Sequence, residues 1–143
     1  MKLSRYFFVA VIATSLFSCK KDNANKTCSL SEANLVGTYT IGAVMYKASA
    51  TAQAVDARSM ADACSLDDTE TYNADHTIIY TDAGVKCDPS DSGTSTWSLS
   101  GNTLKAGVGD EGTISAFDCS GFTITQSNFM VAGDSFMVTF KKQ

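Results

Sequence analysis

The sequence predicts an all-β domain in which eight antiparallel strands follow one another up and down and close into a barrel. Short runs that alternate apolar and polar residues recur along the chain, separated by glycine, asparagine and aspartate. No helical pattern separates consecutive runs in the second half, so parallel crossover connections are not expected. Closing eight strands into a barrel removes the exposed sheet edges, and a β-sandwich is the alternative arrangement.

Residues 1–18 have the form of a secretory signal peptide. Lys2 and Arg5 give a positive start, and the apolar run at 6–13 is too short to span a bilayer of roughly 30 Å as a helix. The run is followed by LFSC at 16–19, which resembles the lipobox of bacterial lipoproteins. That resemblance implies that Cys19 becomes the first residue of the mature protein and carries fatty acyl chains such as palmitate.

Residues 19–34 are predicted to form a lipidated tether, because they are polar and lack periodicity. Stable anchoring needs more than one acyl chain, and a lipoprotein cysteine carries three, so the protein would stay at a membrane surface. The charges after Cys19 are similar to the surface-export signals of Bacteroidota lipoproteins. The resemblance implies an outer-membrane lipoprotein of the cell envelope, on the periplasmic face or the cell surface. The alternative is an ordinary signal peptide and a soluble secreted product.

The chain is acidic, with 11 basic and 15 acidic side chains and a net charge of −4. Loss of residues 1–18 would remove Lys2 and Arg5 and make it more acidic. Nucleic-acid binding is therefore not expected, since it would need a basic stripe. Charge-driven docking on anionic lipid is not expected either. Residues 35–143 are assigned to one domain with its own core.

The first strand is expected at 35–46, where large side chains alternate with glycine and threonine. The segment 47–63 carries alanines at helical spacing and predicts a short helix or ordered loop inserted between strands one and two. The next two strands are expected at 64–72 and 77–81, joined by a turn at 73–76.

Four cysteines remain when Cys19 is set aside, and outside the cytoplasm they predict two disulfides with three possible connectivities. In a hairpin centred after residue 75, Cys64 would lie opposite Cys87, near the ~5.5 Å Cα separation of a disulfide. This register supports the pair Cys64–Cys87 and leaves Cys28–Cys119 by elimination. The cysteines lack C-x-x-C spacing and the chain has one histidine, so no metal site and no cofactor are predicted.

Gly101-Asn102 predicts a two-residue hairpin turn between strands at 94–100 and 102–107. That turn places Leu99 opposite Leu104 and Trp97 opposite Ala106.

Strands are expected at 112–119 and 122–131, separated by Ser120-Gly121, and a final strand follows a turn at Gly133-Asp134. The last turn places Phe129 opposite Val138 and Val131 opposite Phe136.

The order of these motifs resembles the lipocalin-like domain of small Bacteroidota lipoproteins, over roughly residues 35–141. The resemblance is carried by 35–39 (LVGTY), 64–68 (CSLDD), 77–78 (TI), Cys87, 96–104 (TWSLSGNTL), Ile114 and 122–124 (FTI). The family usually has tryptophan where Tyr39 stands and often glycine where His76 stands. The resemblance implies an eight-stranded barrel, and such a barrel either holds one small ligand or is filled by side chains.

The candidate ligand contacts are the large side chains expected inside the barrel. They are Tyr39, Trp97, Phe122, Ile124, Phe136 and Phe140. Lipocalins carry a long first loop over the barrel mouth, so the insert 47–63 is a candidate lid with Val55 or Met60 facing in.

No catalytic site is predicted. His76 lies in an expected turn, and Asp67, Asp68 and Glu70 are interpreted as residues of a solvated loop rather than an acid–base pair or a calcium site. The leading prediction is a non-enzymatic, lipid-anchored protein that binds a small apolar or amphipathic ligand. The alternative is a structural or protein-interaction lipoprotein with a filled barrel, as part of a surface complex or as an inhibitor.

Overall fold

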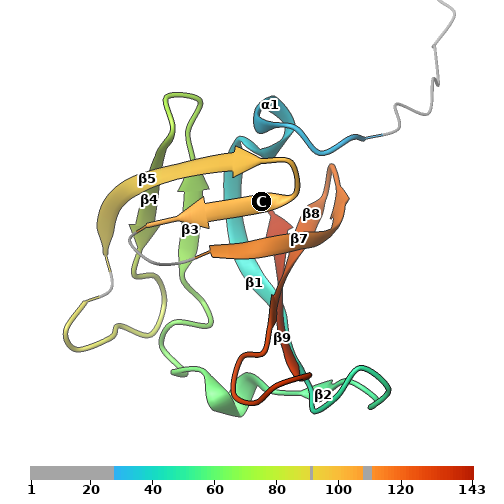
Figure 1. Cartoon of the computed structure of the whole chain (residues 1–143). Coiled ribbons are helices and arrows are strands. Elements are labelled where there is room, and N and C mark those ends of the chain that lie inside the picture. The colour runs from blue at the N-terminus through green and yellow to red at the C-terminus, as the bar shows by residue number, and fades with distance from the viewer. Residues whose placement is uncertain (1–27, 91, 108–110) are drawn as a thin grey trace, which may run out of the picture.

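The computed structural model describes residues 28–90, 92–107 and 111–143, and these form a single antiparallel sheet (Figure 1). The strand order is β2-β1-β3-β4-β5-β6-β7-β8-β9, and β1 also pairs with β9. That last pairing closes every strand except β2 into an eight-stranded ring. The predicted up-and-down barrel is therefore confirmed, with β2 as an extra strand outside the ring.

The strands are short and the described residues contain little helix. The strands are β1 Gly37–Lys47, β2 Val55–Asp56, β3 Thr69–Tyr72, β4 Thr77–Thr81, β5 Gly93–Ser100, β6 Thr103–Ala106, β7 Glu111–Asp118, β8 Gly121–Ser127 and β9 Ser135–Lys142. The helices are α1 Glu32–Leu35 and the 3-10 helix η1 Arg58–Met60.

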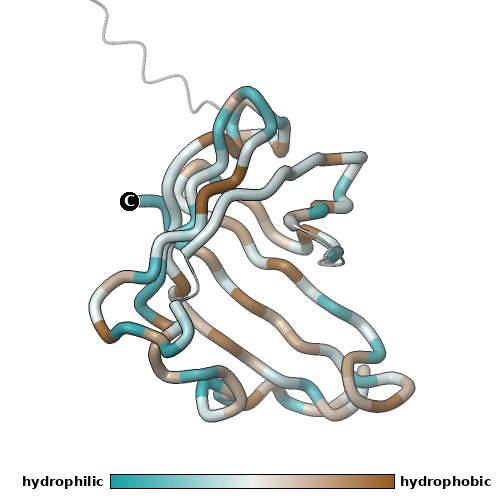
Figure 2. The backbone as a smooth tube through the Cα atoms, turned by 90° about the vertical axis from the view of Figure 1, so that its left-hand side faces the viewer, coloured by the Kyte–Doolittle hydropathy of each residue, from teal (hydrophilic) through white to brown (hydrophobic). Residues whose placement is uncertain are grey.

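Apolar and polar positions alternate along many of the strands, as Figure 2 shows by colour, so each strand directs one face inward. The resulting core consists of Leu35, Tyr39, Tyr72, Ile78, Trp97, Leu104, Ile114, Phe122 and Phe140. The aromatic rings pack edge to face, with centroids 4.9 Å apart for Tyr39 and Phe122 and 5.6 Å for Tyr72 and Trp97. Burial of each large apolar side chain contributes about 1.5–3 kcal/mol.

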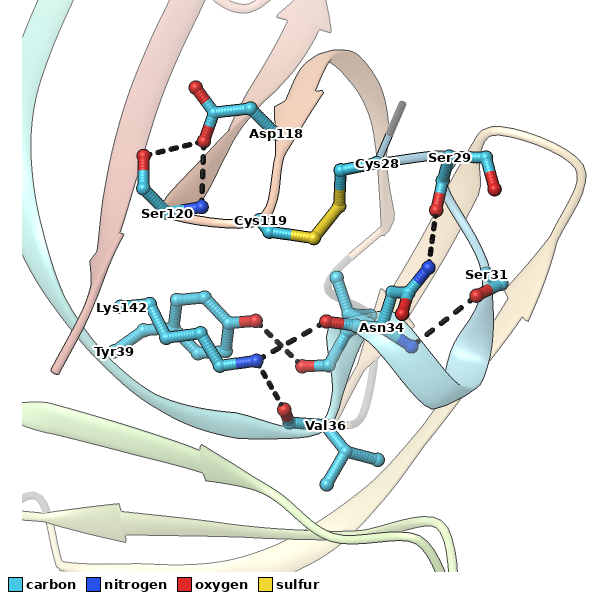
Figure 3. Close-up of a disulfide and its surroundings, with 11 residues drawn as sticks. Cys28, Ser29, Ser31, Asn34, Val36, Tyr39, Asp118, Cys119, Ser120 and Lys142 are labelled. Atoms are coloured by element: carbon cyan, nitrogen blue, oxygen red, sulfur yellow. Dashed lines mark hydrogen bonds between the residues drawn. A yellow bond between two sulfur atoms is a disulfide. The ribbon is translucent and has the colours of Figure 1, made fainter. Parts of the chain in front are cut away.

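The helix α1 covers one end of the barrel. Ser31 caps it by accepting a hydrogen bond from a backbone N–H in its first turn, and its last residue, Leu35, is fully buried. The Tyr39 hydroxyl donates to the Leu35 carbonyl at 2.8 Å, and Lys142 Nζ donates to the Val36 carbonyl at 2.6 Å (Figure 3). These bonds satisfy carbonyls that the short helix leaves without intrahelical partners.

A disulfide ties the residues before α1 to this covered end. Cys28 and Cys119 are bonded, with Cα atoms 5.6 Å apart, and Cys119 lies in the turn between β7 and β8 (Figure 3). Residues 28–34, which the sequence predicts to belong to the tether, form part of the barrel end instead. The predicted signal peptide 1–18 and the acylation site Cys19 lie outside the described residues.

The second disulfide joins Cys64 to Cys87, with Cα atoms 5.3 Å apart, so both predicted pairs are confirmed. The register used to predict it was wrong by one residue, because Glu70 pairs with Tyr80 in a hairpin centred on residue 75. The loop of this hairpin consists of the three residues 74–76, and His76 adopts a φ of 65° in it. The cysteines lie beyond the ends of β3 and β4, so their distance does not depend on that register.

The Gly101 hairpin has the register that its two-residue turn predicts. Leu99 pairs with Leu104 and Trp97 with Ala106, and Gly101 has a φ of 58°. A turn with positive φ suits glycine and matches the twist of the flanking strands.

The last hairpin differs from the prediction. The strand expected to reach residue 131 ends at Ser127, and Val138 pairs with Ile124 instead of Phe129. Residues 128–134 form a loop, because the Asp134 carboxylate accepts backbone N–H groups that a ladder would otherwise use.

The insert between β1 and β3 is not an α-helix. It pairs briefly with β1 through β2, then forms η1. Arg58 holds it to β1 by donating from Nη2 to the Gly42 carbonyl at 2.7 Å. Val55 and Met60 are 56% and 47% exposed, so the predicted inward orientation of these two candidate lid residues is wrong.

Candidate ligand cavity

The barrel is packed at the α1 end and hollow further along its strands. A cavity of about 240 Å³ is walled by residues of β3, β4, β6, β7, β8 and β9. Its apolar wall consists of Leu104, Ala106, Ile124, Val138 and Phe140. Glu111 and Gln126 also line it and are exposed, so the cavity reaches the surface. Its volume is just below the ~300–1,000 Å³ of common ligand pockets, which fits a small ligand.

A second cavity of about 170 Å³ adjoins the first. Both are lined by Glu70, Tyr80 and Phe140, and the second extends past Ile41 toward Asp68. A further hollow of about 240 Å³ lies around the β7–β8 hairpin, but only β7, β8, β9 and the hairpin turn contribute to it. The interior cavities are the stronger candidate site, since strands from around the ring enclose them.

The structure divides the six predicted ligand contacts into three groups. Ile124 and Phe140 line the cavity. Tyr39, Trp97 and Phe122 belong to the packed core, each at most 3% exposed.

Phe136, the sixth, stacks on Phe129, with ring centroids 4.5 Å apart. It does not line the first cavity. The sequence pattern identified inward positions, but it did not show which half of the barrel is filled.

Five polar lining residues were not predicted, namely Glu70, Tyr72, Tyr80, Glu111 and Gln126. Glu70, Tyr72 and Tyr80 all line the cavity, and Glu70 is a half-buried residue of β3. Its interpretation as part of a solvated loop was therefore wrong. The signal was present in the sequence, because Glu70 and Tyr72 are two residues apart on a strand and must share a face.

A carboxylate–phenol pair forms the polar part of the wall. The Tyr72 hydroxyl donates to Glu70 Oε2 at 2.8 Å. Burial raises the pKa of Tyr72 well above its ordinary value, and the negative charge of Glu70 adds to that rise. Tyr72 is therefore a neutral hydrogen-bond donor at physiological pH, held toward an acceptor.

A group of possible metal ligands lies in the loops near the second disulfide. One ligand atom each from Asp68, Asp82 and Cys87 lie within 4.8 Å of one another. The Cys87 sulfur is bonded to Cys64 and is not a thiolate. Asp68 accepts the N–H of Ala83 and Asp82 accepts that of Cys87, so both carboxylates organise the loop backbone.

His76 lies in the turn where it was predicted. Its ring packs on Trp97 with centroids 5.1 Å apart, and Nε2 lies 3.8 Å from a carboxylate oxygen of Glu32 in α1. These contacts hold the turn against the helix at the packed end.

Within the described residues, no helix has both the length and the apolar character needed to cross a membrane.

A family model described as a lipocalin-like domain matches residues 35–131. No curated protein matches the chain, and no solved structure does. The matched region covers more than half of the chain and runs from the end of α1 past the end of β8, while β9 beyond it completes the ring. The closed antiparallel barrel agrees with this match, and the chain belongs to the lipocalin-like domain family.

Proposed function

We propose that this protein is a non-enzymatic lipoprotein of the cell envelope that binds a small apolar or amphipathic ligand inside its barrel. The cavity of about 240 Å³ carries the proposal, because a barrel of eight strands can be filled completely by side chains and this one is not. Its wall is mainly apolar with a few convergent polar groups, which is the usual composition of a ligand site.

Native mass spectrometry of protein purified from its own cells tests the binding. We expect a retained small molecule in the wild type and its loss in Ala106→Phe, which places a ring in the cavity. Ala50→Phe is the matched control, because Ala50 is exposed and lies outside the cavity wall. Retention of the same mass in Ala106→Phe would contradict binding at this site.

The proposed anchor rests on LFSC at 16–19 and on the polar segment that follows. Cells grown with labelled palmitate should incorporate label into the wild type and not into Cys19→Ala. Fractionation should place the wild type in the outer membrane. Label that persists in Cys19→Ala, or a wild type in the soluble fraction, would contradict the anchor and leave the cavity proposal intact.

A protein-interaction role is the second candidate, and one surface loop favours it. Phe129, Met130 and Val131 are 41%, 62% and 58% exposed and stand consecutively in the loop before β9. Cross-linking in intact cells, followed by replacement of all three by serine, tests this role. Loss of a specific cross-linked partner with ligand retention unchanged would favour interaction over binding.

A further inference from the structure

The charge of the interior cavity restricts the ligands that it accepts. Glu70 borders both interior cavities, and its carboxylate accepts the Tyr72 hydroxyl at 2.8 Å. The two oxygens of a carboxylate together offer about four acceptor positions, so hydrogen bonds from protein donors and from a ligand amine are compatible.

Basic side chains do not offset this charge within the cavity. Among the described residues that line the two cavities there is no lysine, arginine or histidine. Glu111 lines the first cavity at its exposed side and pairs with Lys105 at 2.9 Å, where both side chains are more than half exposed. That pair is solvated, so its electrostatic effect inside the cavity is weak.

We propose that the cavity selects amphiphiles with a positively charged amine over those with a carboxylate, and that Glu70 makes the discrimination. This inference rests on the proposed binding function. A ligand ammonium would gain a charge-assisted hydrogen bond, roughly twice as strong as a neutral one. A ligand carboxylate would bring a like charge next to Glu70 inside an apolar wall, and such juxtaposition opposes binding.

Calorimetric titration with octylamine, octanol and octanoate tests the preference, because the three probes share one tail and differ in the head group. The full chain is held in lipid nanodiscs. Identical discs that carry Ala106→Phe measure the background signal from probe that enters the lipid instead of the cavity. We expect octylamine to bind at least about tenfold more tightly than octanoate, with octanol between them.

Two variants assign the preference to Glu70. Glu70→Gln should bring the octylamine to octanoate ratio close to one. Glu32→Gln is the matched control, because Glu32 lies in α1 and lines neither interior cavity, and it should leave the ratio unchanged. Gln126→Lys places a positive charge at the cavity without altering Glu70, and it should shift the preference toward octanoate. If Glu70→Gln does not fold, the wild type decides the test, because octylamine that binds no more tightly than octanol would overturn the inference.

The outcomes separate the two proposals. Octanoate binding equal to or tighter than octylamine binding in the wild type, or a ratio unchanged by Glu70→Gln, would overturn the inference and leave the binding function standing. Binding of all three probes at the Ala106→Phe background would overturn both.

Discussion

A single carboxylate organises the loop before β9. Asp134 accepts the N–H groups of Phe129, Met130 and Val131 at 2.6, 3.0 and 3.1 Å, and the Tyr46 hydroxyl at 2.9 Å. Burial alone would raise the pKa of Asp134, but the hydrogen bonds together outweigh it and hold the pKa below its ordinary value of 3.8. The folded state therefore favours the charged form of this side chain.

The lowered pKa of Asp134 makes the stability of the fold depend on pH. Because the folded pKa of Asp134 is lowered, its contribution to stability is present above the ordinary pKa of 3.8 and is lost as pH falls through the lower folded value. We expect Asp134→Asn to have a lower thermal midpoint than the wild type at pH 7, with a gap that narrows below about pH 4. Circular dichroism melts from pH 2 to pH 7 measure it, and a gap constant over this range would contradict the prediction.

His76 occupies a backbone conformation that favours glycine. Its φ is 65°, and the left-handed region costs a non-glycine residue roughly 1–2 kcal/mol. The contact with Trp97 and the proximity of Glu32 help to hold it there. A glycine at this position would avoid that cost.

Two substitutions separate the backbone cost from the ring contact. His76→Gly and His76→Ala both remove the ring, but only glycine relieves the backbone. We expect the glycine variant to be more stable than the alanine variant by about 0.5–1 kcal/mol in urea unfolding, with both variants below the wild type. Equal stability of the two variants would show that the turn relaxes around alanine.

At the scale of elements, the sequence predicted the positions of the strands better than their ends. The two-residue turn at Gly101 fixes its hairpin register locally, and that register is correct. The strand expected to reach residue 131 was too long, because Phe129 and Val131 alternate as in a strand but Asp134 binds the backbone of their loop. Those backbone bonds are local in sequence, but the Tyr46 hydroxyl that also binds Asp134 comes from β1, and no local pattern encodes that contact.

The two disulfides close chain loops of different length. Cys28 and Cys119 are separated by 91 residues, and Cys64 and Cys87 by 23. In the chain-entropy account a longer loop stabilises the fold more, by about 4–5 kcal/mol near 100 residues and about 3 kcal/mol near 15.

Removal of each bridge tests this difference. We expect the double variant Cys28→Ser, Cys119→Ser to lose more free energy of unfolding than Cys64→Ser, Cys87→Ser, by about 1 kcal/mol. Guanidinium unfolding of both variants and the wild type measures it. The reverse order would indicate that the loops around Cys64 and Cys87 are strained or packed in a way that outweighs chain entropy.

At the scale of the molecule, the barrel has a packed half and a hollow half. Leu35, Tyr39 and Phe122 fill the half under α1, while Leu104, Val138 and Phe140 reach the cavity. The sequence predicted the ring and its inward positions, because those follow from alternation and strand count. It did not predict which half is hollow, because that depends on how far each ring reaches across the closed barrel.

The same leucine-to-alanine substitution should therefore cost a different amount of unfolding free energy in each half of the barrel. Leu35 and Leu104 are 0% and 1% exposed, but only Leu104 borders the cavity. We expect Leu35→Ala to cost close to 5 kcal/mol and Leu104→Ala about 2–3 kcal/mol, because packing is already incomplete around Leu104. Chemical denaturation measures both, and an equal cost would indicate that the cavity wall is as tightly packed as the covered end.

The disulfide between Cys28 and Cys119 also determines at which end of the barrel the N-terminal segment enters. It fastens the leading segment beside α1, whereas β2 and the loop before β9 lie at the far end of the molecule (Figure 1). If Cys19 carries acyl chains as proposed, the anchored segment joins the barrel at the end that α1 covers. We then expect the barrel to take up solutes from the surrounding fluid instead of extracting lipids from its own membrane.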